Sequence, residues 1–175
     1  MINVIDNFFY ENDFAILTAS AHSKLYIPSY QPKQLFVHDR LKAYPCYETE
    51  ILLNTDYLFK TFWETFENKT NLKIKKLKTF LRKILSIELE NVFKYRLTPH
   101  QDDKEFDLAG VIYINNFNLL DGTNIYSNLY QIEPDIVVGA KPNRCLYYSS
   151  NMWHSPGHDK NTELRLIQPF FITLA

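Results

Sequence analysis

The chain of 175 residues is long enough for one domain with a single core, and its 46% hydrophobic content supplies the side chains for that core. A net charge of −1 argues against a strongly basic protein that coats nucleic acid, and the composition does not indicate disorder. Two cysteines are too few for a disulfide framework, and no stretch reaches the roughly 18 apolar residues of a membrane span, so we expect a soluble, cytoplasmic protein without a signal peptide.

Residues 1–90 are expected to be mainly helical. The segment from Ile2 to Ile5 predicts a short strand, and Asn12-Asp13 marks the start of a helix that continues through Phe14. Three prolines interrupt residues 24–46, which predicts an irregular stretch that could cover a substrate.

Two further helices are predicted between residues 54 and 84. The first begins at Asn54 or Thr55 as its N-cap and places four apolar residues on one face, namely Leu58, Phe59, Phe62 and Phe66. In the second, apolar residues follow at steps of three and four, as along one stripe of a helix: Ile74, Leu77, Leu81 and Ile84. The remaining surface is basic and indicates a solvated face or, alternatively, a patch for an acidic partner; it holds Lys73, Lys75, Lys76, Lys78, Arg82 and Lys83.

Residues 91–175 are expected to form strands separated by turns. The run from Leu108 to Ile114 is almost wholly apolar, as in a buried strand, and Asp121-Gly122 is a strong turn signal. Further strands are predicted over 92–97, 123–126, 144–148 and 164–174. Helices followed by short strands indicate an α+β fold, with the helices packed on one sheet of a sandwich or barrel.

The segment His100-Gln101-Asp102 is the first candidate for chemistry, because side chains two residues apart on a strand point to the same face. A polar turn after Pro99 explains the same residues equally well. His154 follows the predicted strand 144–148 and could face the same cavity, with a loop histidine that binds nothing as the alternative. Two histidines and one carboxylate leave three metal positions open, as in non-haem iron(II) oxygenases, although zinc or manganese could also bind them.

Arg165 lies among apolar residues of the last predicted strand. A charged group is costly to bury without a partner, and a guanidinium suits a carboxylate that it can bind through two hydrogen bonds. Arg165 therefore indicates a carboxylate site, with an arginine that faces solvent as the alternative. Arg96 is a second candidate, but it precedes His100 and is expected to face outward or toward substrate.

The order His-x-Asp, a distant His and an Arg in the last strand resembles the 2-oxoglutarate/iron(II) oxygenase superfamily. Four surrounding segments resemble its prolyl 4-hydroxylase-like members: Tyr95 to Asp102, Tyr113-Ile-Asn115, Asp121-Gly-Thr123 and Val4 to Phe8. The resemblance covers most of residues 91–172 and the first half only loosely. Two positions depart from the family pattern, because Ile167 stands where Ser or Thr is frequent and Asp121 stands where the turn has its first Gly.

The resemblance implies a single domain over residues 1–175. Its core would be a double-stranded β-helix (jelly roll) at about 91–175, with N-terminal helices within about 1–90 packed on one sheet. It also implies iron(II) bound by His100, Asp102 and His154, and 2-oxoglutarate bound through its distal carboxylate by Arg165 and Tyr113, with Tyr95 as a further contact.

Other residues compete for these roles. Asp103 would point to the opposite face of a strand from Asp102. His158 could replace His154, which we prefer because its distance to Arg165 and its neighbour Trp153 resemble the family. His22 and His38 are expected to be ordinary surface or packing histidines.

The implied activity is that of a dioxygenase that hydroxylates a C–H bond with Fe(II), 2-oxoglutarate and O₂, and ascorbate is a further candidate requirement. Prolyl 4-hydroxylase-like motifs favour a prolyl or other amino-acid residue in a peptide or protein, with a small molecule as the alternative substrate. A nucleobase is disfavoured by the net charge of −1. The carboxylate of Asp102 favours hydroxylation over halogenation, because halogenating relatives leave that position to the halide. Two rival functions stay open: a non-catalytic metal- or carboxylate-binding module on the same fold, and a cupin-like metal enzyme that does not use 2-oxoglutarate.

Overall fold

The computed structural model describes residues 1–28, 46–85, 99–115, 117–157, 159 and 161–175. Several sequence-based predictions lie outside these residues: the strand at 92–97, nearly all of the irregular segment 24–46, and the candidates Tyr95, Arg96, His38 and His158. The metal-ligand candidates, Tyr113 and Arg165 all lie within them.

Eight strands form one antiparallel sheet, the main sheet: β1 (Ile2–Ile5), β2 (Ile27–Pro28), β3 (Tyr47–Glu48), β4 (Ile74–Thr79), β5 (Arg82–Leu85), β6 (Leu108–Tyr113), β9 (Arg144–Ser149) and β11 (Leu164–Leu174). Their order is β1-β9-β6-β11-β5-β3-β2, and β4 also pairs with β11. Strand β11 holds the sheet together, because β6 runs along one of its edges while β5 and β4 share the other.

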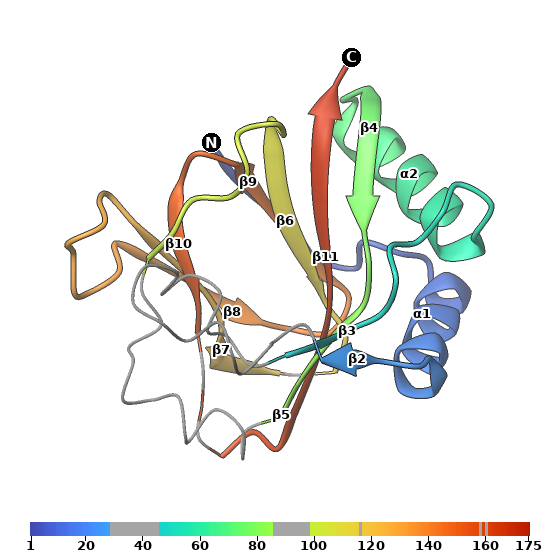
Figure 1. Cartoon of the computed structure of the whole chain (residues 1–175), viewed down its shortest axis with the longest axis horizontal. Helices are drawn as coiled ribbons and strands as arrows, with labels where there is room; N and C mark the ends of the chain where they lie inside the picture. Colours follow the sequence, from blue (N-terminus) through green and yellow to red (C-terminus); the bar gives the residue numbers. More distant parts are fainter. Residues whose placement is uncertain (29–45, 86–98, 116, 158, 160) are drawn as a thin grey trace.

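A second, small sheet contains three antiparallel strands, with β7 (Asn118–Tyr126) between β8 (Ile136–Ala140) and β10 (Trp153–Pro156). An apolar cluster joins the two sheets and includes Val111 and Ile167 from the main sheet and Ile125 and Val138 from the small one. The chain is thus built mostly of antiparallel sheets with few helices, which is consistent with the expected jelly-roll core (Figure 1).

Strand β6 is buried along its whole length because both of its faces are covered. Ala109, Val111 and Tyr113 belong to the cluster between the two sheets, whereas Leu108 and Ile112 belong to the cluster on the other side. The unbroken apolar run from Leu108 is therefore confirmed as a buried strand.

Two helices, α1 (Glu11–Ser23) and α2 (Tyr57–Thr70), lie beside the main sheet on the side away from the small sheet (Figure 1). The predicted apolar stripe of α2 reaches that sheet, since the rings of Phe62 and Phe170 have centroids 4.7 Å apart and those of Phe66 and Tyr147 are 5.2 Å apart. Among the described residues, neither helix combines the length and hydropathy that crossing a membrane requires.

The helix predicted over residues 74–84 is wrong, because this segment forms β4 and β5, both antiparallel to β11. The register of β4 against β11 shifts between Thr173 and Leu174, so that Lys75 is an extra residue on β4. A β-bulge of this kind lets Ile74 and Leu77 both be buried. Their spacing of three residues therefore comes from the bulge and only mimics a helical period.

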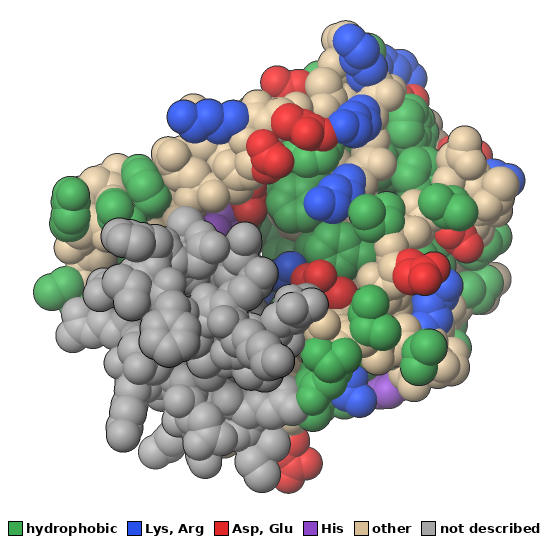
Figure 2. Space-filling view, in the orientation of Figure 1, with side chains coloured by type: hydrophobic (Ala, Val, Ile, Leu, Met, Phe, Trp, Pro, Cys, Tyr) green, Lys and Arg blue, Asp and Glu red, His purple; other side chains and the backbone are tan. Residues whose placement is uncertain are grey.

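The basic residues of this segment consequently belong to strands, except Lys73, which directly precedes β4. Lys73 pairs with Glu67 at 3.0 Å, Lys76 pairs with Glu105, and Lys78 lies over an aromatic ring. Within the described part of the chain β4 pairs with β11 alone, and charged side chains protect such an edge from pairing with another chain. Basic and acidic side chains alternate near β4 in Figure 2, which favours a solvated edge over a surface for an acidic partner.

Candidate metal centre

Backbone hydrogen bonds bring the two separate ligand segments together. The N–H of His100 donates to the carbonyl of His154 at 2.8 Å, and the N–H of His154 donates to the carbonyl of His100 at 2.9 Å. The N–H of Asp102 donates to the carbonyl of Ser150 at 3.0 Å. The segment 101–103 is thus not a regular strand, but this pairing still places His100 and Asp102 beside β10.

One ligand atom from each of His100, Asp102 and His154 lies within 4.8 Å of the others. This spread is close to twice a metal–nitrogen or metal–oxygen bond of about 2.1 Å, so small side-chain rotations bring all three atoms onto one ion. His154 is buried, and His100 and Asp102 are half-buried. In Figure 2, a histidine and an acidic side chain lie next to each other on the face shown.

The ring of His154 is held in one orientation by its own backbone neighbourhood. Its Nδ1 lies 3.0 Å from the carbonyl of Met152, which accepts a hydrogen bond from Nδ1–H in the matching neutral tautomer. Nε2 then carries the lone pair, and it lies 3.4 Å from Oδ2 of Asp102. A histidine whose second nitrogen donates to a carbonyl is oriented in the way that metal ligands usually are.

Burial shifts the pKa values of two of these groups in opposite directions. Burial raises the pKa of Asp102 to about 6, against the lowering effect of His100 and Arg82. Burial lowers the pKa of His154 to about 4, although its hydrogen bond to Met152 opposes this. At neutral pH, Asp102 is therefore mostly ionised and His154 is neutral, which are the forms that bind a metal ion.

Metal binding to this cluster is expected to weaken in mild acid. A proton competes with the ion for Asp102 below the carboxyl pKa of about 6, so this residue alone should weaken binding about tenfold between pH 7 and pH 5. The measurement is calorimetric titration with Mn²⁺ at several pH values, in wild type and in Asp102→Asn. The asparagine variant should retain only the pH dependence that belongs to the imidazoles. An equal slope in both proteins would mean that Asp102 is not the titrating ligand.

Arg165, on β11, is 4% exposed and donates to two backbone carbonyls. Its Nη1 lies 2.9 Å from the carbonyl of Gly157, and its Nη2 lies 3.0 Å from that of Gly122. Its buried Nε has no hydrogen-bond partner, and no carboxylate of the described residues forms an ion pair with the guanidinium. The guanidinium of Arg165 is thus surrounded by backbone carbonyls, and none of the described residues supplies an anion to it.

Tyr113 lies beside the guanidinium of Arg165. The guanidinium carbon of Arg165 lies 5.9 Å from the centre of the Tyr113 ring, and the Tyr113 hydroxyl lies 2.7 Å from Oγ1 of Thr123. Burial raises the pKa of Tyr113, although the charge of Arg165 opposes this, so the phenol stays protonated and can donate a hydrogen bond. Together, Arg165, Tyr113 and Thr123 offer hydrogen-bond donors to a carboxylate; we call them the carboxylate pocket.

The departure from the family pattern at Asp121 has a structural role. Its side chain is fully buried and accepts hydrogen bonds from the N–H of Asp159 at 2.7 Å and from the hydroxyl of Thr162. Asp121 thereby fixes the loop that follows Gly157. Only glycine fits at position 157, because a Cβ there would lie 2.3 Å from the carbonyl oxygen of Leu120. The second departure, Ile167, belongs to the apolar cluster between the sheets.

Sequence reasoning misses two residues of this region, Thr123 and Tyr148. Thr123 belongs to the segment that resembles the family's Gly-Gly-Thr turn, so that motif could have indicated it. The turn predicted at Asp121-Gly122 is wrong, because these residues lie within β7, where the pairing with β8 is irregular between Asn118 and Thr123. The ring of Tyr148 lies 4.8 Å from the ring of His154. Alternation along β9 separates Tyr148 from Tyr147 but does not tell which of the two faces the metal cluster.

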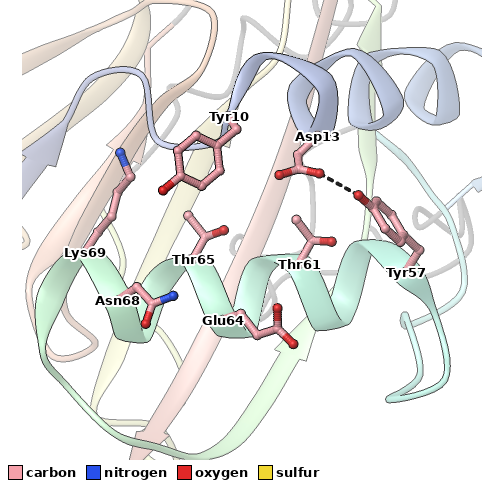
Figure 3. Close-up of a pocket in the computed structure, with 8 residues that line it drawn as sticks. All are labelled: Tyr10, Asp13, Tyr57, Thr61, Glu64, Thr65, Asn68 and Lys69. Carbon is pink, nitrogen blue, oxygen red and sulfur yellow. Dashed lines mark hydrogen bonds between the residues drawn. The ribbon is translucent and has the colours of Figure 1, made fainter.

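A separate groove lies between α1 and α2, on the helix side of the main sheet (Figure 3). Eight residues line it: Tyr10, Asp13, Tyr57, Thr61, Glu64, Thr65, Asn68 and Lys69. The Tyr57 hydroxyl donates across the groove to Oδ1 of Asp13 at 2.5 Å. None of these residues belongs to the metal cluster or the carboxylate pocket, so the groove is no part of this site.

Solved structures of 2-oxoglutarate/iron(II) oxygenases share this fold. An oxidoreductase of the 2OG-Fe(II) oxygenase family from Burkholderia pseudomallei aligns with a TM-score of 0.63 and 8% identity, over 98% of this chain and 85% of that one. A prolyl-4-hydroxylase from Pseudomonas putida aligns with a TM-score of 0.61 and 10% identity, over 98% of this chain and 91% of that one. The third structure is a prolyl hydroxylase from Trichoplax adhaerens in complex with a hypoxia inducible factor oxygen degradation domain peptide fragment. It aligns with a TM-score of 0.61 and 13% identity, over 98% of this chain and 83% of that one.

No family model and no curated protein sequence matches the chain, so the likeness rests on three-dimensional structure. At these identities it establishes the fold alone. The resemblance indicated by the sequence motifs is confirmed at that level: the chain has the fold of the 2-oxoglutarate/iron(II) oxygenases, a group that includes prolyl 4-hydroxylases.

Proposed function

We propose that the chain is an iron(II)- and 2-oxoglutarate-dependent dioxygenase that hydroxylates a C–H bond. One observation carries this proposal: β10 joins a His–Asp–His cluster to a buried arginine that has no carboxylate partner among the described residues. His154 lies on β10, and the carbonyl of Gly157, three residues further on, accepts a hydrogen bond from Arg165. At about 3.3 Å per residue, the two ends of the site lie about 10 Å apart along the strand.

The residues present fit iron(II). Two imidazole nitrogens and one carboxylate oxygen are ligands that this ion accepts, and three ligands leave three positions for other molecules. His154 is already oriented through Met152, and its lowered pKa keeps it neutral. We therefore assign His100, Asp102 and His154 as the catalytic metal ligands.

The residues present also fit 2-oxoglutarate. Hydrogen bonds to neutral carbonyls offset only part of the desolvation cost of a buried guanidinium, and an anionic carboxylate would offset more of it. We assign Arg165 and Tyr113 to the distal carboxylate of this cosubstrate, with Thr123 supporting the Tyr113 hydroxyl. Tyr95 is proposed as a further contact, and the requirement for ascorbate stays a prediction.

Iron(II) with 2-oxoglutarate and O₂, when bound, would supply the oxidising power for hydroxylation and yield succinate and CO₂. The chain's own residues hold and shield these components. His100, Asp102 and His154 would hold the metal with three ligand atoms and leave its remaining positions to 2-oxoglutarate and O₂. Apolar side chains of the cluster between the sheets, including Val111, Ile125 and Ile167, keep bulk water from this region. The carboxylate of Asp102 is present, which favours hydroxylation over halogenation.

For the substrate we propose a prolyl or other amino-acid residue within a peptide. Two structures with this fold are named as prolyl hydroxylases, and one of them is in complex with a peptide fragment. Their likeness to this chain is a likeness of fold, which does not specify the substrate. The first experiment therefore asks whether proline or another side chain is hydroxylated.

The test is succinate formation by protein reconstituted with Fe(II) and supplied with 2-oxoglutarate, O₂ and a library of proline-containing peptides. The expected result is succinate in proportion to a peptide that gains one oxygen atom. Cosubstrate binding without succinate, for every peptide and amino acid tried, would favour the non-catalytic module. Metal binding without 2-oxoglutarate binding would favour the cupin-like enzyme.

A further inference from the structure

Tyr148 is a buried phenol beside the metal cluster for which neither the motifs nor the proposed mechanism has a role. It lies on β9 and is 5% exposed. Its ring centroid is 4.8 Å from that of His154, with 49° between the ring planes. It belongs to the apolar cluster between the two sheets, together with Tyr113 and Ile167. The side chain therefore faces the interior that the metal cluster and the carboxylate pocket share.

Tyr148 links the two ends of that interior through its neighbours. Its ring contacts that of His154, at the metal end, and it belongs to the same buried cluster as Tyr113, in the carboxylate pocket. The strand register agrees, since Tyr148 pairs with Ala109 on β6, and Ala109 and Tyr113 lie on the same face of that strand. Tyr148 therefore lies on the side of the main sheet that carries both the metal cluster and Tyr113.

Within the described part of the chain, the hydroxyl of Tyr148 forms no hydrogen bond, and its oxygen is not one of the fully buried side-chain atoms without a partner, so it faces open space. Other tyrosine hydroxyls of the chain do: Tyr113 bonds to Thr123 at 2.7 Å, and Tyr126 bonds to Ser155 at 3.0 Å. Buried tyrosines usually find a partner for the O–H group. A phenylalanine would fill the same apolar space without this unpaired donor, so packing alone does not account for the hydroxyl.

We infer that Tyr148 is a further cosubstrate-binding residue, whose hydroxyl donates a hydrogen bond to the metal-binding end of 2-oxoglutarate. This inference rests on the proposed function. Tyr148 contacts the ring of His154, which places it closer to the metal cluster than Arg165 is, so it serves the 2-oxo acid end and not the distal carboxylate. Arg165 and Tyr113 hold one end of the cosubstrate, and Tyr148 orients the other.

The test compares Tyr148→Phe with Tyr147→Phe. Tyr147 is the matched control, because it is 6% exposed and adjacent on β9 but packs against Phe66 in the helix-side cluster. The measurements are anaerobic titrations of the Fe(II) protein with 2-oxoglutarate and with pyruvate, which shares the 2-oxo acid end but has no distal carboxylate. Both are followed by the visible metal-to-ligand charge-transfer band. Mn²⁺ affinity and melting temperature are measured in the same proteins.

Tyr148→Phe is expected to weaken binding of both 2-oxo acids about tenfold or more, the loss typical of one hydrogen bond to a charged group. Its band should also move to higher energy, because a donated hydrogen bond stabilises the ligand orbital that receives the electron. Mn²⁺ affinity should not change, and Tyr147→Phe should behave as wild type. A role in packing alone would move the melting temperature but not the band.

Each other outcome has a defined meaning. Unchanged 2-oxo acid binding in Tyr148→Phe, with a normal band in wild type, would overturn the role of Tyr148 and leave the proposed function intact. Weaker binding of 2-oxoglutarate but not of pyruvate would overturn the assignment to the metal end. Absence of any band in wild type would instead refute the proposed function, on which the inference rests.

Discussion

Replacing His154 with alanine is expected to abolish the charge-transfer band of the anaerobic iron(II)–2-oxoglutarate complex. Succinate formation should fall by more than the roughly 10–100-fold loss that follows removal of an outer-shell partner. His154 is the buried ligand of the cluster, and its Nε2 lies 3.4 Å from Asp102. Without this imidazole, only His100 and Asp102 remain to hold the ion, and two ligands do not fix a chelated complex.

The controls for His154→Ala separate loss of the ligand from loss of the fold. The hydrogen bonds that join His100 to residue 154 are made by the backbone, so they do not require the imidazole. His22→Ala, at an exposed position on α1, should keep both band and turnover. A full-strength band in a folded His154→Ala protein would show that another residue binds the metal.

The anaerobic titration with iron(II) and 2-oxoglutarate also decides between His154 and His158 as the metal ligand. His158 competes with His154 for the role of the distant ligand, and it lies outside the described residues. In the structure, the described ligand atoms of His100 and Asp102 meet those of His154. His158→Ala should therefore retain the band that His154→Ala loses.

The spacing of residues along the sequence predicted that His100 and Asp102 act together. The position of His154 depends on backbone pairing between distant parts of the chain. The step of two residues from His100 to Asp102 correctly indicated that both side chains share a side, even though the segment is not a regular strand. No spacing could indicate that the backbone of His100 pairs with that of His154, because this contact joins distant parts of the chain. The family resemblance provided that link, and the structure brings the three residues together.

The fold shows the same limit of local pattern. The apolar run at Leu108 and the stripe of α2 were recognised because each has one period along its length. The segment 74–84 was mistaken for a helix because the bulge at Lys75 interrupts the alternation of a strand. Tyr148 was missed for a related reason, since alternation distinguishes two faces of β9 but not which one meets the metal cluster.

Arg165→Ala is expected to weaken 2-oxoglutarate binding by about 100-fold or more while leaving Mn²⁺ affinity unchanged. Removing one partner of a buried charge pair costs roughly 3–5 kcal/mol, which corresponds to about 10²–10⁴ in affinity. The measurement is the same anaerobic titration, with Mn²⁺ calorimetry alongside. Arg165→Lys should fall between wild type and alanine, because lysine keeps the charge but cannot bind a carboxylate bidentately.

Arg165 also donates to the carbonyls of Gly157 and Gly122, so its removal could disturb the loop after β10. Pyruvate resolves this ambiguity, because it binds the metal end without requiring the carboxylate pocket. If Arg165→Ala binds pyruvate as wild type does but loses 2-oxoglutarate, the arginine recognises the distal carboxylate in a site that is otherwise intact. If both ligands are lost, the loop has collapsed, and melting temperature and Mn²⁺ affinity should fall as well. Equal 2-oxoglutarate affinity in wild type and Arg165→Ala would show that another residue binds the distal carboxylate, and the assignment of Arg165 would be wrong.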